Sequence, residues 1–251
     1  MLGLFRAELL KQRTTWRTLG LVVGLVALVC FVVLLHGSVI PLRMATHDDE
    51  MKVFGWGQLG VLFAGLLGAL SITAELRHGT IRPTFLVSPR RGRVLLAKVA
   101  ASGLAGLLFA VAAEALTISI GSALLAARGI PIRLDGGDWA QLVAGGAVAG
   151  ALWAPIGLAL GALVRNQIAT VVGLVAWLLF VESLLIGQLP GAARYLPGAV
   201  GAAIGGGSTI TGEVPTSSVL LAPLLGAVLL VFYAVAATAA GIVATNRRDV
   251  P

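Results

Sequence analysis

The sequence predicts an all-α integral membrane protein whose chain crosses the bilayer six times. Of its 251 residues, 58% are hydrophobic and only 12% are charged, and the mean hydropathy is +0.97. A soluble domain has about 25% charged residues, so this chain has too little charge to cover a water-facing surface. Its apolar stretches are continuous, which favours helices and excludes the alternating strands of a closed β-barrel.

Six stretches reach the roughly 20 apolar residues that a helix needs to cross the hydrocarbon core of a bilayer. We expect these spans at about 18–35, 56–73, 94–127, 140–164, 168–188 and 219–245, within one transmembrane domain that covers 1–251. The third span is longer than the bilayer requires, so it should tilt or extend into the cytosol. Lys98, near the start of that span, is expected to extend its ammonium group to the membrane surface.

The basic residues predict the orientation of the spans, because cytoplasmic loops carry an excess of lysine and arginine. Most of the 18 basic residues lie in the amino-terminal segment, in the second loop and in the other connections on the same side. Both termini are therefore expected in the cytoplasm, and the net charge of +7 is a topology signal that gives no reason to expect nucleic acid as a partner. The excess of arginine over lysine, with many alanines and glycines, indicates only a GC-rich bacterial gene. We expect the chain in the bacterial inner (plasma) membrane.

The amino-terminal segment 1–17 has the pattern of an amphipathic helix. Its apolar stripe consists of Leu2, Phe5, Leu9 and Trp16. The basic stripe beside it consists of Arg6, Arg13 and Arg17. Such a helix can lie in the membrane interface, with its apolar side in lipid and its arginines at the headgroups. The alternative is a basic flank that only sets the orientation of the first span.

The cytoplasmic loop 74–93 contains the most informative local signals. Gly79 is a natural end for the helix that leaves the second span. Thr80 can then cap a new helix, and Pro83 is tolerated in the first turn of that helix. The loop therefore predicts a short helix at 81–87, followed by Ser88-Pro89 as the cap and first position of the third span.

This short helix would present Ile81 and Phe85 as an exposed apolar pair, one turn apart and surrounded by arginines. A hairpin that only fixes orientation needs neither an ordered helix nor an exposed apolar pair. We therefore favour a docking element for a soluble partner over a plain positively charged hairpin.

The connection 189–218, between the fifth and sixth spans, is long but not hydrophilic. It is too rich in glycine and proline for another span. We expect two short helical pieces in it, at about 191–196 and 199–204, that dip into the outer leaflet. Broken backbone at that depth is tolerated only against protein or water.

Two acidic residues, Glu114 and Glu182, fall inside the third and fifth spans. A charge at mid-membrane costs about 2.5–3.5 kcal/mol on insertion scales, so each side chain should face the bundle or an aqueous cavity. Thr117, Ser119 and Ser183 are near enough in sequence to share hydrogen bonds with them. The functional interpretation is a translocation path or outer gate, and the alternative is a structural contact between helices.

The residues for hydrolytic chemistry are missing from the sequence. No histidine lies within a predicted span to serve as a base, and no Cys/His cluster has the spacing of a zinc site. The phosphate-binding motif G-x-x-x-x-G-K-[ST] is also absent, since none of the three lysines follows a glycine. We expect no catalytic residue, cofactor or metal on this chain.

The segment from Glu75 to Arg82, followed by Ser88-Pro89-Arg90-Arg91 and Lys98, resembles the first cytoplasmic loop of type-2 ATP-binding cassette (ABC) exporter permeases. The basic amino-terminal helix, the six spans and the broken outer connection are similar as well. The resemblance implies that 1–17 is a connecting helix and that 81–87 is a coupling helix. It also implies that a set of loop residues contacts a separate ATPase subunit. These residues are Glu75, Arg77, Gly79, Thr80, Ile81, Arg82, Pro83 and Phe85.

By the same resemblance, two ATPase subunits would bind ATP and Mg²⁺, and a second permease chain would complete the translocation path. The aromatic share of only 6% departs from the aromatic-lined channels of polysaccharide exporters and favours a small amphipathic, drug-like or lipid-like substrate. Two other functions remain open. One is a carrier driven by an ion gradient, with Glu114 or Glu182 as its proton site. The other is a membrane scaffold that docks a soluble partner without transport.

Overall fold

The computed structural model describes residues 2–39, 46–87, 90–206 and 220–247, and within these ranges the chain is helical apart from short connections and contains no strand. Six helical stretches are long and apolar enough to cross a membrane. They are Trp16–Val39, His47–Arg77, Arg91–Ala127, Gly136–Val164, Gln167–Gln188 and Pro223–Arg247. The predicted class, an all-helical chain with six candidate membrane spans, is confirmed.

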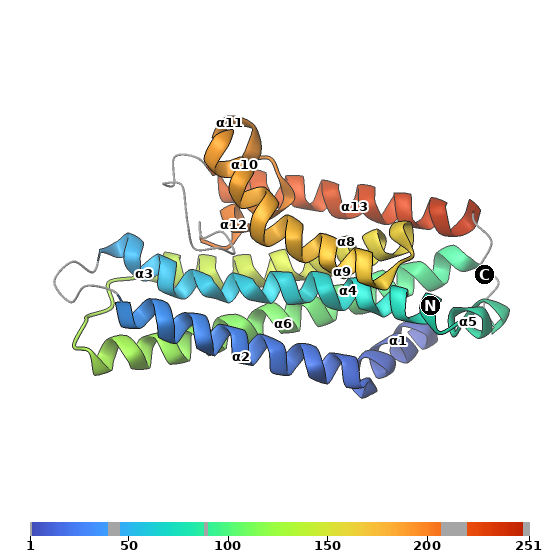
Figure 1. Cartoon of the computed structure of the whole chain (residues 1–251), viewed down its shortest axis with the longest axis horizontal. Helices are drawn as coiled ribbons and strands as arrows, with labels where there is room; N and C mark the ends of the chain where they lie inside the picture. The colour runs from blue at the N-terminus through green and yellow to red at the C-terminus, as the bar shows by residue number, and fades with distance from the viewer. Residues whose placement is uncertain (1, 40–45, 88–89, 207–219, 248–251) are drawn as a thin grey trace.

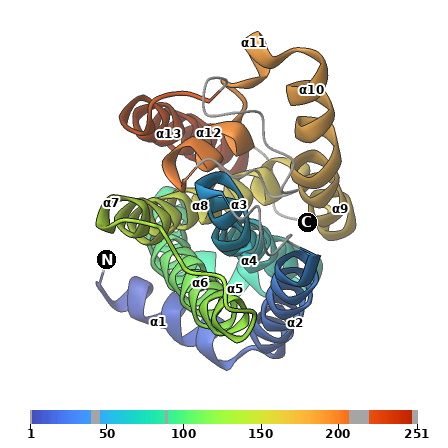
Figure 2. The same cartoon turned by 90° about the vertical axis from the view of Figure 1, so that its left-hand side faces the viewer.

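The helices form one elongated bundle (Figure 1). In chain order they are α1 (Leu2–Thr14), α2 (Trp16–Val39), α3 (His47–Phe54), the 3₁₀ turn η1 (Gly55–Gln58), α4 (Leu59–Arg77), α5 (Ile81–Val87), α6 (Arg91–Ala127), α7 (Gly136–Ala140), the π-helical turn η2 (Gln141–Gly145), α8 (Gly146–Val164), α9 (Gln167–Ala176), the π-helical turn η3 (Trp177–Val181), α10 (Glu182–Gln188), α11 (Pro190–Ala193), α12 (Pro197–Ile204) and α13 (Pro223–Arg247). The helices α1 and α5 and the last turns of α13 lie at one end of the bundle, which we call the α5 end (Figure 1). The helices α3, α7, α11 and α12 lie at the other end, the α12 end, which faces the viewer in Figure 2.

The amino-terminal helix is shorter than expected, because α1 ends at Thr14 and a new helix, α2, starts at Trp16. Trp16 and Arg17 therefore belong to the first span, and the predicted stripe that joined Trp16 to the first helix is wrong. The hydroxyls of Thr14 and Thr15 donate to the carbonyls of Leu10 and Lys11. Such side-chain bonds compete with the helical ladder and favour its end here.

The second candidate span starts well before the predicted residue 56, because α3 occupies part of the expected acidic loop. Thr46 caps α3 in a reciprocal arrangement with Asp49. The Thr46 hydroxyl accepts from the Asp49 amide at 3.3 Å, and the Asp49 carboxylate accepts from the Thr46 amide at 3.1 Å. This capping box is visible in the sequence as Thr-x-x-Asp, a signal that predicts a helix start and that the hydropathy pattern hides.

The outer connection contains two short helices, α11 and α12, close to the expected ranges 191–196 and 199–204. Both begin at a proline, Pro190 and Pro197, which suits the first helical position because proline has no amide hydrogen to leave unpaired. The rest of the connection, from residue 207 to 219, lies outside the described residues. The sixth candidate span then starts at Pro223, four residues after the predicted start.

The centre of the bundle is α8, which packs against α4, α6 and α13 (Figure 2). Its backbone touches the backbones of α4 and α6 through pairs of glycines. A Cβ atom on Gly68 would overlap the Ala154 carbonyl, and one on Gly157 would overlap the Gly65 carbonyl. On the other side, a Cβ on Gly150 would lie 2.6 Å from the carbonyl oxygen of Gly106. Small residues allow this close approach, and van der Waals contact between backbones then holds the helices together.

We expect Gly68→Ala to separate α4 from α8, because the added methyl group meets a carbonyl and not a flexible side chain. Overpacking of this kind costs about 1–3 kcal/mol or more, which corresponds to an apparent melting temperature lower by roughly 5 °C. The matched control is Gly173→Ala in α9, where a Cβ atom meets nothing within 4 Å. Thermal denaturation of both purified variants in detergent tests this packing, and an equal loss for both would contradict it.

Candidate functional site

The short helix α5 occupies Ile81–Val87, the range in which the sequence predicts a short helix. Gly79 ends the preceding helix with a φ of +69°, a backbone conformation that glycine adopts without strain.

The exposed apolar pair expected on α5 is wrong for Ile81. Ile81 is buried, with 1% of its surface exposed, and it packs in a cluster with Ile72, Leu95 and Leu158. This cluster anchors the start of α5 to α4, α6 and α8. Among the described side chains of α5, the exposed apolar one is Leu86, which is 85% exposed. The side chains of Arg82 and Phe85 lie outside the described part of the chain.

The third candidate span begins at Arg91, with Arg90 in a non-helical conformation before it. The described helix therefore starts two residues after the predicted first position, and the predicted cap, Ser88-Pro89, lies outside the described residues. The Arg91 side chain donates to the carbonyl of Thr245 at 3.3 Å. This bond joins the start of α6 to the last turns of α13.

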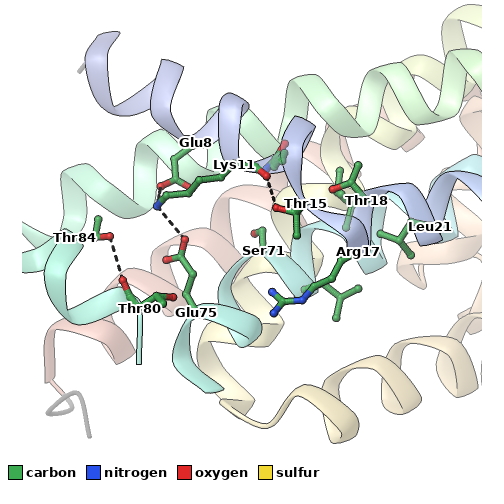
Figure 3. Close-up of a pocket in the computed structure, with 13 residues that line it drawn as sticks. Glu8, Lys11, Thr15, Arg17, Thr18, Leu21, Ser71, Glu75, Thr80 and Thr84 are labelled. Atoms are coloured by element: carbon green, nitrogen blue, oxygen red, sulfur yellow. Dashed lines mark hydrogen bonds and ion pairs between the residues drawn. The ribbon is translucent and has the colours of Figure 1, made fainter. Parts of the chain in front are cut away.

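Four charged side chains meet where α1, α4 and α6 come together at the α5 end. The ammonium of Lys98 lies 2.6 Å from Glu8 Oε2 and 2.7 Å from Glu75 Oε1. The ammonium of Lys11 lies 2.8 Å from Glu8 Oε1 and 3.1 Å from Glu75 Oε1 (Figure 3). Each lysine thus bridges the same two glutamates, and we call this group, Glu8, Lys11, Glu75 and Lys98, the four-charge cluster.

The cluster is buried on the bundle side and open on the other. Lys98 is 1% exposed, so the prediction that its ammonium reaches the headgroups is wrong; two carboxylates inside the protein hold it instead. Lys11 is 46% exposed. Burial works against the charged form of Lys11, but the hydrogen bond to Glu8 and the charge of Glu75 outweigh this effect and raise the pKa of Lys11 above its ordinary value.

Glu8 is the functional candidate that sequence reasoning missed. It is 4% exposed and forms the centre of the inner face of α1, whereas the predicted apolar residues Phe5 and Leu9 are only half-buried. The available signal is that Glu8 is the single acidic residue of a basic segment. A buried charge needs a partner, but the sequence does not show that this partner is Lys98, 90 residues away.

The residues implied to contact a partner subunit divide into two groups. Glu75 and Ile81 face the inside of the bundle. Four others, all exposed, surround the start of α5. They are Arg77, Gly79, Thr80 and Pro83. The basic residues Arg6, Arg13 and Arg17 are exposed as expected, although the last lies on α2.

A pocket of about 270 Å³ lies next to the four-charge cluster, between α1, α2, α4 and the first turn of α5 (Figure 3). Glu8, Lys11 and Glu75 form part of its wall, and Arg17 lies at its α2 side. A second cavity of about 490 Å³ lies between α8, α9 and α13 and is lined mainly by apolar side chains, among them Trp153, Trp177 and Tyr233.

Glu114 is completely buried, and neither of its carboxylate oxygens has a hydrogen-bond partner. Two glycines enclose it: a Cβ atom on Gly57 would overlap the carboxyl group, and one on Gly146 would lie 3.0 Å from Oε1. The expected hydrogen bonds to neighbours are wrong, because Thr117 is also buried without a partner and Ser119 donates to the carbonyl of Ala115.

Glu182 has a different environment. Its carboxylate accepts from the Trp177 indole and from the backbone amides of Gly198 and Ala199, both at 3.0 Å. These amides belong to the first turn of α12, where the helix dipole favours a negative charge. Glu182 therefore joins the fifth candidate span to α12, which is the structural contact that the sequence left open as one of two interpretations.

No family model matches the sequence, and no curated protein is detectably similar to it. In the ranges that the structure describes, no group of three or more His, Cys, Asp or Glu side chains is arranged to hold a metal ion. The candidate site is therefore defined by geometry alone: α5, the four-charge cluster and the adjacent pocket.

We expect Lys98→Met to be far more destabilising than Lys11→Met, although both lysines contact the same two carboxylates. Loss of Lys98 leaves the bundle side of both carboxylates without its buried cation, at a cost of about 3–5 kcal/mol. Water can replace the half-exposed Lys11, so its loss should cost about 1 kcal/mol or less. Melting temperatures of the two purified variants compare these effects directly. Equal losses would show that the buried lysine does not organise the cluster.

We expect Gly57→Ala to be strongly destabilising and Glu114→Ala to relieve part of that cost, because the new methyl group would overlap the Glu114 carboxyl. A double-mutant cycle on thermal stability should give a coupling of about 1–3 kcal/mol between the two sites. Gly187→Ala, where a Cβ meets nothing within 4 Å, is the control and should be additive with Glu114→Ala. Additivity in both cycles would contradict the enclosure of Glu114 by Gly57.

Proposed function

We propose that this chain is the transmembrane permease subunit of an ATP-driven ABC exporter. It would pair with a second permease chain, identical or related, to form the translocation path. Two copies of a separate ATPase subunit would bind ATP and Mg²⁺, because this chain lacks a nucleotide-binding motif. The proposal starts from the resemblance of the segment 75–98 to the first cytoplasmic loop of such permeases. The structure supports it through the way in which α5 is attached to the bundle.

The observation that carries the proposal is that a short, outward-facing helix is tied firmly to several spans. Ile81 anchors α5 in the apolar cluster with Ile72 and Leu95, while Leu86 points into solvent. One turn and a half before α5, Glu75 is held by Lys98 of α6 and by Lys11 of α1. A force applied to α5 would therefore reach α4 and α6 through packed side chains and α1 through ion pairs. Close-packed interiors transmit such displacements.

The spans that receive this force are also the ones whose backbones touch. Gly68 and Gly157 bring α4 against α8, and Gly106 and Gly150 bring α6 against α8. The three helices should move as one body when α5 is pushed. ATP-driven closure of the ATPase dimer would act on α5 in this way, and the rigid spans would transmit the tilt to the α12 end.

The orientation and the substrate class are parts of the same proposal. The basic residues place the α5 end and both termini on the cytoplasmic side of a bacterial inner membrane. The first candidate span, α2, and the fifth, formed by α9, η3 and α10, bury only 17% and 22% of their most apolar windows. They have room to face lipid and a second permease chain. The apolar 490 Å³ cavity supports a small amphipathic, drug-like or lipid-like substrate.

One observation favours the alternative of a carrier driven by an ion gradient. Glu114 is fully buried in a span and its carboxyl has no partner, which is the setting expected of a proton-binding residue. Glu182 does not fit that role as well, because three donors already bind it. A non-transporting scaffold would keep the docking surface around α5 but would show no coupling to ATP hydrolysis.

The first experiment is gentle purification of the tagged chain from its native membrane. We expect an ATPase subunit to co-purify and the complex to show vanadate-sensitive ATP hydrolysis. Transport by the isolated chain in proton-gradient vesicles, without an ATPase, would overturn the proposal in favour of the carrier. A co-purified partner without nucleotide hydrolysis would favour the scaffold.

The second experiment tests α5 as the coupling element. Leu86→Asp should weaken binding of the ATPase subunit on the order of tenfold, since it places a charge at the exposed apolar position of α5. Glu75→Ala should leave binding in place but uncouple transport from hydrolysis. Leu189→Asp is the matched control, because Leu189 is an exposed leucine at the α12 end. If all three variants bind and transport like the wild type, α5 is not the coupling element.

A further inference from the structure

We propose that the 270 Å³ pocket beside the four-charge cluster is a binding site for an anionic phospholipid of the cytoplasmic leaflet. The phosphate group would lie between Arg17 and Lys11, and one acyl chain would follow the leucines at the other end of the pocket. The assignment does not depend on the chain being an ABC permease. It depends on the order of polar and apolar groups along the pocket, on an unpaired arginine and on the level of the pocket in the membrane.

The lining of the pocket changes from charged to apolar along its length. On α4, Glu75, Ser71 and Leu67 lie on one face, each one turn from the next. On α2, Arg17 is followed one turn later by Leu21, and Leu70 of α4 joins the apolar end. Figure 3 shows the same order, with Glu75 and Thr80 on one side of the view and Leu21 on the other. An amphipathic molecule fits such a pocket in one orientation only.

The charge of the pocket selects a negative headgroup. The two lysines and two glutamates of the four-charge cluster cancel one another. Arg17, which is exposed, makes no hydrogen bond or ion pair with the described residues and leaves the pocket with net positive charge. The hydroxyls of Thr18 and Thr80 donate to no described group either. A phosphate accepts from an arginine fork and from hydroxyls, so these groups are complementary to it.

The position of the pocket favours a lipid over a soluble phosphate compound. Arg17 is the last charged residue before the apolar run of the first span, so it lies at the level of the headgroups. Basic pockets between spans on the cytoplasmic side are a known mode of headgroup binding. The adjacent Leu21, Leu67 and Leu70 would have no use for a soluble anion but can contact the first part of an acyl chain. The remainder of the lipid would stay in the bilayer.

The test is lipid binding to the purified chain, measured by native mass spectrometry in detergent with added phosphatidylglycerol, phosphatidylcholine or inorganic phosphate. We expect phosphatidylglycerol to bind most tightly. Arg17→Ala should weaken this binding by about tenfold, as expected for loss of a charge-assisted hydrogen bond. Thr18→Val, which keeps the shape of the side chain, should weaken it by a smaller factor.

The matched control is Arg13→Ala. Arg13 is also exposed in the basic amino-terminal segment, but it does not line the pocket. Its loss should change the affinity for phosphatidylglycerol by less than about twofold, because exposed charges beyond a contact are screened. Equal losses for Arg13→Ala and Arg17→Ala would overturn the proposal, since they would show only a general basic surface. Equal binding of phosphatidylcholine would overturn the anionic selectivity, and displacement of the lipid by inorganic phosphate would overturn the role of the acyl chain.

Discussion

The contact of three backbones, those of α4, α6 and α8, forms the centre on which the other long helices of this bundle pack. Lipid tails are as apolar as leucine, so burial of apolar side chains does not drive spans together as it does in water. Close contact between backbones replaces that force, and it requires glycine at each crossing point. Once α4 and α6 are fixed on α8, α2 packs on α6 and α13 packs on α8. The pocket, the four-charge cluster and the anchor of α5 all lie at one end of this central group.

Three buried ionisable side chains in the bundle have three different environments. These environments separate structural from functional candidates. Lys98 is neutralised completely by two glutamates from different helices. The Glu182 carboxylate accepts hydrogen bonds from backbone amides of α12, so it needs no buried cation as a partner. The Glu114 carboxyl has neither a cation nor a backbone amide as a partner among the described residues, and the glycines that enclose it leave no space for another side chain. Since an unpaired ion is far more costly in lipid than a paired one, Glu114 is the strongest candidate of the three for a functional role.

The sequence predicts the spans of this protein well, because hydropathy depends only on local composition. The prediction for 94–127 ends at the same residue as α6, and that for 140–164 ends with α8. The starts are less accurate, since they depend on side-chain caps: Thr46 adds α3 to the second span, and Thr15 separates α1 from α2. Turn chemistry, which is also local, predicts the position of α5 correctly.

The parts that could not be predicted depend on which helices meet. The sequence shows that Glu8 is an isolated acid and that Lys98 is a cation near a span, but their pairing follows from the crossing of α1 and α6. Ile81 was expected to be exposed because helical periodicity alone cannot tell which face of a short helix meets the bundle. The pocket cannot be predicted for the same reason, because its lining combines residues from four helices, α1, α2, α4 and α5.

The four-charge cluster connects the two proposals physically, because Glu75 belongs both to the cluster and to the wall of the lipid pocket. Any movement of α5 that shifts the end of α4 displaces Glu75 relative to Lys11 and so changes the space between Lys11 and Arg17. A lipid that binds more tightly to one arrangement of Glu75, Lys11 and Arg17 must then favour the matching position of α5. The coupling is reciprocal, so the position of α5 changes the binding free energy of the lipid by the same amount. An anionic leaflet would in this way bias the position of α5 both through Glu75 and directly, because Thr84 of α5 also lines the pocket.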